Sequence, residues 1–134
     1  MLLNAAKPTA EHLLQKNGEF YPFAYAMCGD GQMVAVAGYD ERDRPPSGDL
    51  IQLLKDAFRR GARSNKYQAT ALVFDARVKL PSSGAVSDAI AIALDHRDDG
   101  YSVLVLYPYE LKDGTLTMHE AYAEPGEVDI FRNE

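Results

Sequence analysis

The chain has 134 residues, of which 46% are hydrophobic and 25% are charged, and its formal net charge is -6. These totals are typical of one globular domain over residues 1–134, and they exclude a disordered or low-complexity chain. The negative charge argues against a nucleic-acid partner, because nonspecific binding to nucleic acid needs a basic patch.

The first third of the chain predicts a helix followed by a hairpin. A helix is expected over Thr9–Asn17, with Pro8 and Thr9 at its cap. The aromatic segment 20–28 and the segment 33–39 predict two strands, and Gly29-Asp30-Gly31 predicts the turn between them.

The clearest helical pattern follows a charged, proline-containing loop at residues 40–48. Ser47 or Asp49 can cap this helix, and Gly61 permits a close approach to whatever the helix covers. Its apolar residues recur at three- and four-residue spacing, which is typical of a helix with one buried face. Its end is basic, and we interpret these basic residues as a solvated helix terminus. The apolar stripe consists of Leu50, Leu53, Leu54, Ala57, Phe58 and Gly61, and the basic end of Arg59, Arg60, Arg63 and Lys66.

The second half predicts four strands, at residues 69–80, 85–97, 101–109 and 115–123. The resulting order is helix, two strands, helix, four strands. Short turns favour antiparallel neighbours, so we expect an α+β fold with two helices and a largely antiparallel sheet of about six strands.

One hairpin carries most of the antiparallel assignment. Asp99-Gly100 between two alternating runs is typical of a two-residue turn, which would place Leu94 opposite Val105 and Ile92 opposite Tyr107. Neither face is polar along the middle, so the hairpin is expected at the centre of the sheet and covered on both sides. One face carries Ile90, Ile92, Leu94, Val103, Val105 and Tyr107; the other carries Ala89, Ala91, Ala93, Leu104, Leu106 and Pro108.

The candidate site residues are Asp88, His119 and Glu120. Asp88 shares a strand face with two isoleucines, so a buried Asp88 would need a hydrogen-bond donor, a cation or a proton. His119 and Glu120 are neighbours in an expected strand and should point to opposite faces, which would keep them from serving one centre. Asp75 is expected to pair with Arg77 on the same strand face.

Several classes of site are disfavoured. Nucleophile-elbow, dinucleotide-loop, phosphate-loop, helical two-histidine and calcium-loop patterns are missing, so no cofactor and no metal are expected. Cys28 is the single cysteine, which excludes an internal disulfide and a four-cysteine zinc site. No apolar run approaches the roughly 20 residues of a membrane helix and no signal-peptide pattern is present, so a cytoplasmic protein without membrane contact is expected.

Four short segments resemble a group of small uncharacterised bacterial proteins, in which a short helix precedes a Gly-Glu-Phe-x-Pro-Phe-Ala strand and a glycine turn. The resemblance covers about half of the chain and implies a bacterial domain without named active residues. The segments are Gly18-Glu19-Phe20-Tyr21-Pro22-Phe23-Ala24, Gly29-Asp30-Gly31, Asp88-Ala89-Ile90 and Tyr107-Pro108-Tyr109.

Two functions from different classes fit the sequence. Eight tyrosines, the negative charge and the missing catalytic motifs favour a non-enzymatic protein-interaction domain, either a homodimer or other homo-oligomer or a binder of another protein. An immunity protein that neutralises a basic toxin is one version. The alternative is a small enzyme or ligand-binding protein with Asp88, His119 or Glu120 in a pocket on the sheet, which requires two of them within hydrogen-bond reach of one cavity.

Overall fold

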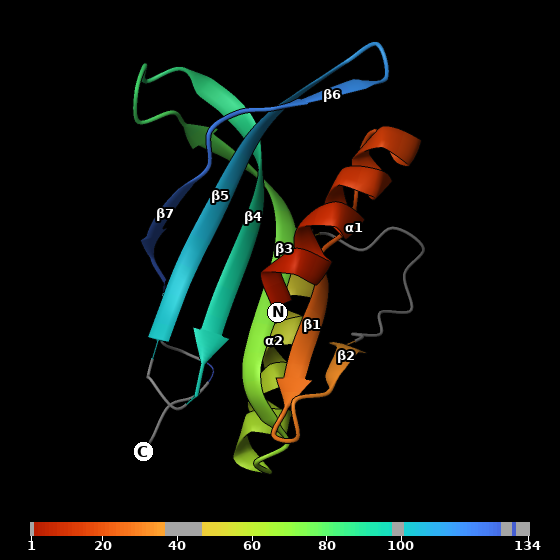
Figure 1. Cartoon of the computed structure of the whole chain (residues 1–134), viewed down its shortest axis with the longest axis vertical. Helices are drawn as coiled ribbons and strands as arrows, with labels where there is room; N and C mark the ends of the chain where they lie inside the picture. Colours follow the sequence, from red (N-terminus) through yellow and green to blue (C-terminus); the bar gives the residue numbers. More distant parts are fainter. Residues whose placement is uncertain (1, 37–46, 98–100, 127–129, 131–134) are drawn as a thin grey trace.

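The chain folds into one twisted sheet with a helix on each face (Figure 1). The computed structural model describes residues 2–36, 47–97, 101–126 and 130. Its elements are, in chain order, α1 (Leu2–Asn17), β1 (Phe23–Cys28), β2 (Met33–Val36), α2 (Ser47–Arg63), β3 (Tyr67–Lys79), β4 (Val86–His96), β5 (Tyr101–Lys112), β6 (Thr115–Met118) and β7 (Tyr122–Pro125).

The strands lie in the order β2-β1-β3-β4-β5-β6, and β7 also pairs with β5. Every neighbouring pair is antiparallel. This confirms the expected α+β class and the antiparallel sheet, with seven strands in place of about six. The loop expected at 40–48 and the end of the strand expected at 33–39 fall largely outside the described residues.

The register of the central hairpin differs from the expected one by two residues. Leu94 pairs with Val103, and Ile92 pairs with Val105. The last described pair is His96 with Tyr101, and the turn expected at Asp99-Gly100 lies outside the described residues. Because side chains alternate with a period of two, an even shift moves no residue to the other face, and the expected faces of this hairpin are correct.

The strand expected at 115–123 is divided by a bulge. Met118 pairs with Tyr109, whereas Tyr122 pairs with Leu106, so the chain gains one residue relative to β5 between the two pairs. His119 N still donates to Pro108 O at 2.9 Å. One extra residue exchanges the two faces, and Tyr122 therefore lies on the opposite face from Met118.

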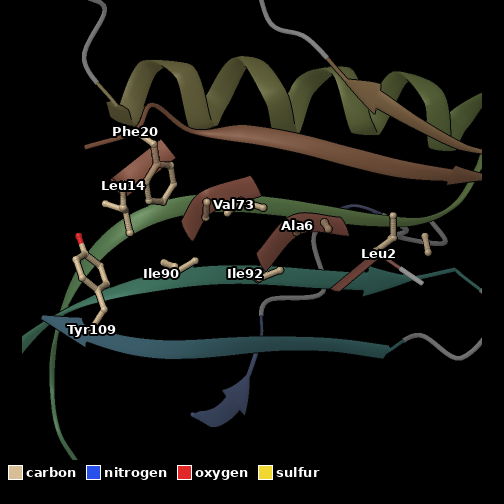
Figure 2. Packing of buried hydrophobic residues seen from close by; sticks show 11 residues of the cluster. Leu2, Ala6, Leu14, Phe20, Val73, Ile90, Ile92 and Tyr109 are labelled. Atoms are coloured by element: carbon tan, nitrogen blue, oxygen red, sulfur yellow. The ribbon is translucent and has the colours of Figure 1, made fainter. Parts of the chain in front are cut away.

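Face A of the sheet is the face covered by α1. Its core joins helix residues at four-residue spacing to alternate strand residues and is drawn in Figure 2, where Leu14, Phe20 and Tyr109 lie together at one end and Leu2 at the other. Thr9 Oγ1 lies 3.2 Å from Tyr25 Oη and ties the helix to β1. The buried members are Leu2, Ala6, Ala10, Leu14, Phe20, Ala69, Ala71, Val73, Ile90, Ile92 and Tyr109.

Helix α1 begins seven residues before the expected start and contains Pro8. The expectation that Pro8 and Thr9 cap the helix is wrong. A proline removes one backbone donor and crowds the preceding turn, which favours a helix start at this position. Leu2 and Ala6 are buried against the sheet on the same stripe as Leu14, and this burial favours the longer helix.

Face B is the face covered by α2, which packs over β1, β2 and β3. Leu54 and Phe58 of the expected stripe are buried against Ala24 and Leu72. Gly61 lies against the ring of Tyr67, which occupies the space that a Cβ atom would need, so the expected close approach is confirmed. Neither helix is long and apolar enough to cross a membrane.

Candidate functional site

An acidic depression lies on face A beside the end of α1. It has a volume of about 370 Å³ and is lined by Glu19, Phe20, Tyr21, Asp75, Ala76, Arg77 and Asp88. These residues come from the segment after α1 and from β3 and β4. More than 50 residues of the sequence separate that segment from the residues of β3 and β4. We call this set of residues the acidic depression.

Strand periodicity places its charged residues in one row. Asp75 and Arg77 are two apart in β3 and share face A. Arg77 pairs with Asp88 in β4, and Asp88 pairs with Tyr109 in β5. Gly18 ends α1 with a positive φ of 77° and donates to Leu14 O at 2.8 Å, which directs the following Glu19 towards this row.

The contacts in the row differ from the expected Asp75–Arg77 pair. Tyr109 Oη donates to Asp75 Oδ1 at 2.8 Å, and Arg77 Nε lies 3.5 Å from Asp88 Oδ1. The expected pairing considered only neighbours on β3, whereas these partners come from β4 and β5. Asp88 is exposed, because it lies near the open end of β4 beyond the buried Ile90.

The electrostatics of the row favour a bound positive charge. Loss of hydration raises the pKa of Asp75, and the carboxylates of Asp88 and Glu19 raise it further, against the hydrogen bond from Tyr109. Burial, the hydrogen bond to Asp75 and the charges of Asp75 and Asp88 raise the pKa of Tyr109. The carboxylates thus repel one another, and a cation placed among them would reduce this repulsion.

Three segments quoted for the resemblance meet at this depression. Glu19, Phe20 and Tyr21 of segment 18–24 and Asp88 of segment 88–90 line it, and Tyr109 of segment 107–109 donates a hydrogen bond to Asp75 in the lining. No family model, curated protein or solved structure matches the chain. Within the described residues, no group of three or more histidine, cysteine, aspartate or glutamate side chains is arranged to hold a metal ion.

His119 and Glu120 lie elsewhere, at the bulge between β6 and β7. Both are exposed and line a second depression of about 400 Å³, together with Ser82 from the turn between β3 and β4. The expectation that they lie within a strand is wrong, because they lie between β6 and β7, and both of them border one depression. The structure gives neither side chain a hydrogen bond or an ion pair with any described residue, and Asp88 does not line this depression.

A third cavity lies on face B, between α2 and strands β4 and β5. It measures about 290 Å³ and is mostly apolar, with Ile51, Phe58 and Leu104 in its wall. Lys55 and the buried Asp95 also line it. Cys28 is half-buried beside the α2 core, as expected of a small hydrophobic residue.

The sequence did not single out Glu19, Tyr21 or Tyr109 as site residues. Tyr109 reaches Asp75 diagonally across β4, and this contact depends on the registers of two strand pairs. Glu19 and Tyr21 occur in segment 18–24, which carries the resemblance. This was the sequence feature from which they could have been predicted as site residues. Tyr21 is 47% exposed, which is a high fraction for a large aromatic residue. It lines the same depression as three carboxylates.

Proposed function

We propose that the chain is a non-enzymatic protein-interaction domain whose acidic depression binds a basic side chain of a partner protein. The observation that carries this proposal is the grouping of Glu19, Asp75 and Asp88 around one depression beside the exposed ring of Tyr21. Arg77 is the one basic residue in its described lining, and it already lies against Asp88.

The chemistry suits a lysine or arginine side chain. A guanidinium group pairs well with carboxylates, and a cation over an aromatic face gains about 0.5–1 kcal/mol at an exposed site. Tyr21 offers such a face at the rim. The net charge of -6 would also speed the approach of a basic partner at low ionic strength.

A basic toxin is one partner that fits, which would make the protein an immunity protein. The resemblance to small bacterial proteins supports a bacterial origin and, with it, a role in the bacterial cytoplasm. In this proposal the partner is a protein, with no part for nucleic acid, membrane, cofactor or metal.

The alternative is an enzyme or ligand-binding protein that uses the second depression. The observation in its favour is that His119, Glu120 and Ser82 line one surface. Against it, catalysis by a histidine needs a hydrogen-bonded partner that orients the ring, and His119 has none among the described residues.

Titration of the isotope-labelled protein with a short peptide of alternating glycine and arginine tests the proposal. Amide signals around Glu19, Asp75 and Asp88 should shift, and a peptide with glutamate in place of arginine should have no effect. Glu19→Gln and Asp88→Asn should each weaken binding about two- to fivefold, because both carboxylates are exposed and an exposed charge pair contributes about 0.2–1 kcal/mol.

Glu110→Gln is the matched control, because Glu110 is an exposed acid on face B and its change removes the same charge. Equal weakening by Glu110→Gln would mean that only net charge matters, and the proposal would fail. Signals that move around His119 and Glu120 instead would support the alternative function.

A further inference from the structure

Strand β2 forms one edge of the sheet (Figure 1). It pairs with β1 on one side, and no other described strand pairs with it. Its residues, Met33–Val36, include no charged side chain and no proline, and its pairs with β1 run without a bulge. Charges, prolines and bulges protect many sheet edges from pairing, and this short edge has none of them.

The backbone groups on the open side of β2 belong to alternate residues. Cys28 N donates to Gln32 O at 2.8 Å, so these two residues form a hydrogen-bonded pair of the hairpin. Both valines of β2 lie at even steps from Gln32, and their backbone groups therefore also bond to β1. The N–H and C=O groups of Met33 and Ala35 point the other way, towards the open edge.

A depression with two basic side chains lies beside this edge. It has a volume of about 370 Å³ and lies between β2 and the second half of α2, with Arg60 and Lys66 in its wall. Val36 and Tyr67 of the face B core also line it, which places it on face B. We call this set of residues the basic depression. The uncharged residues of its described lining are Ala35, Val36, Ala57, Gly61, Ser64 and Tyr67.

The two positive charges of the basic depression have no acidic partner among the described residues. Arg60 is exposed, and Asp56, four residues before it in α2, instead bonds to Arg59 at 3.2 Å. Lys66 Nζ lies 5.6 Å from the centre of the Tyr67 ring, a contact that orients the ammonium group without neutralising it. A carboxylate placed in the basic depression is therefore attracted by both cations.

We propose that β2 and the basic depression together bind an extended acidic segment of a partner protein. The segment adds to the sheet as an antiparallel strand, and its backbone bonds to Met33 and Ala35. Its side chains on face B lie beside the basic depression, which favours glutamate or aspartate there. The residues between them lie on face A beside Met33, which is 39% exposed and favours apolar side chains.

The charges decide against a second copy of the chain as the occupant. Two β2 strands paired about a twofold axis would bring the basic depressions of both copies to the same side of the joined sheet, where they repel. A basic segment is repelled in the same way. The net charge of -6 opposes an acidic segment only weakly, because salt screens charges beyond about 8 Å, whereas the two cations act at contact.

Titration of the whole isotope-labelled chain at physiological ionic strength tests the inference. The probe is a short peptide of alternating glutamate and valine with blocked ends. Amide signals of Met33, Ala35, Arg60 and Lys66 should shift, with a dissociation constant below about 1 mM. A peptide with lysine in place of glutamate should cause no shift at the same residues.

N-methylated peptides test the strand pairing without changing the protein. In an antiparallel strand beside β2, the valines lie opposite Met33 and Ala35 and donate their N–H groups to them, whereas the glutamate N–H groups point away. Methyl groups on the valine nitrogens should abolish binding, and methyl groups on the glutamate nitrogens should leave the affinity within about twofold, since no bond to β2 is lost. Equal loss from both peptides would overturn the strand addition.

Ala35→Pro tests the same bonds from the side of the protein. Proline lacks the N–H that faces the open edge, and its φ is compatible with an edge strand, so the pairing of β2 with β1 is kept. Affinity should fall about fivefold or more, whereas Ala35→Val, which keeps the N–H, should bind within about twofold. The amide signals of β1 check that Ala35→Pro keeps its hairpin, and the methylated peptides decide the matter if it does not.

Charge variants test the basic depression. Arg60→Gln and Lys66→Gln should each weaken binding about two- to fivefold, the range for an exposed charge pair. Arg63→Gln is the matched control, because Arg63 is exposed in the last turn of α2, does not line the basic depression and loses the same charge. Equal weakening by the control would show that only net charge matters, and the inference would fail.

Absence of any shift at β2 with about 1 mM peptide would overturn the inference outright. Shifts confined to the acidic depression would overturn it as well. The acidic depression lies on face A and is read by the arginine peptide, so failure here leaves the proposed function standing, and the reverse also holds.

Discussion

At the scale of single residues, the contact between Tyr109 and Asp75 is the most informative. Tyr109 of β5 is buried, and its hydroxyl donates to the carboxylate of Asp75 in β3. The two residues are 34 positions apart in the chain and lie on the same face of the sheet. The bond supplies a partner for the buried hydroxyl, and it holds Asp75 beside Asp88. A charge kept among like charges costs stability, which is typical of sites that bind a ligand of opposite charge.

Asp75→Asn should stabilise the protein near neutral pH. The pKa of Asp75 is raised above its ordinary value of 3.8, so the folded state binds the proton more tightly than the unfolded state. Stability is therefore lost as pH rises from 3.8 through the raised pKa. Asparagine removes this loss and still accepts the bond from Tyr109, with a gain below about 1 kcal/mol because water screens the exposed carboxylate. Urea unfolding at neutral and acidic pH measures the gain.

The pH dependence supplies the control for this variant. The difference between Asp75→Asn and the unchanged chain should disappear below the ordinary pKa of 3.8, where Asp75 is protonated in both states. Tyr109→Phe should instead lose about 1 kcal/mol, as expected for one hydrogen bond. A loss of stability in Asp75→Asn near pH 7 would mean that the charge of Asp75 stabilises the fold.

At the scale of elements, the two helices differ in how well the sequence predicted them. The apolar stripe of α2 was predicted correctly because its residues recur at regular spacing. The helix also has an acidic residue in its first turn and basic residues in its last turn, which are typical helix ends. Helix α1 was predicted too short because Pro8 is a local signal to start a helix, whereas the burial of Leu2 and Ala6 depends on the sheet below them. A local signal was outweighed by burial that the sequence does not display.

Gly61→Ala should destabilise the protein by about 1–3 kcal/mol, the range for an overpacked core. The new Cβ would collide with the ring of Tyr67, which is only 7% exposed. Thermal unfolding measures the loss.

Gly48→Ala is the control within the same helix. No atom lies within 4 Å of the position that its Cβ would take, so this variant should be neutral or gain up to about 1 kcal/mol of helix propensity. Equal stability of the two variants would show that the ring of Tyr67 moves aside at little cost.

At the scale of the whole molecule, the acidic depression and the apolar cavity of about 290 Å³ lie on opposite faces of one sheet. The acidic depression is on face A near the end of α1, and the cavity is on face B beside α2. The sheet between them is closely packed around Ile90, Ile92 and the alanines of β4.

The two faces should act independently, because distant sites without shared partners are close to additive. Val78→Glu, a change on face B, should leave the affinity of face A for the arginine peptide within about twofold. Peptide titration of this variant checks the prediction. A larger change would show that the two faces are coupled.

The sequence by itself determined the fold class, the order of the elements and the face on which most strand residues lie. Each of these follows from a local period, 3.6 residues for a helix and two for a strand, and survives an even error in register, as the pairs of Leu94 and Ile92 show. Only the tertiary structure decided the start of α1, the bulge at His119 and the meeting of Glu19, Asp75, Asp88 and Tyr109. These depend on which distant segments come into contact, and no local period carries that information.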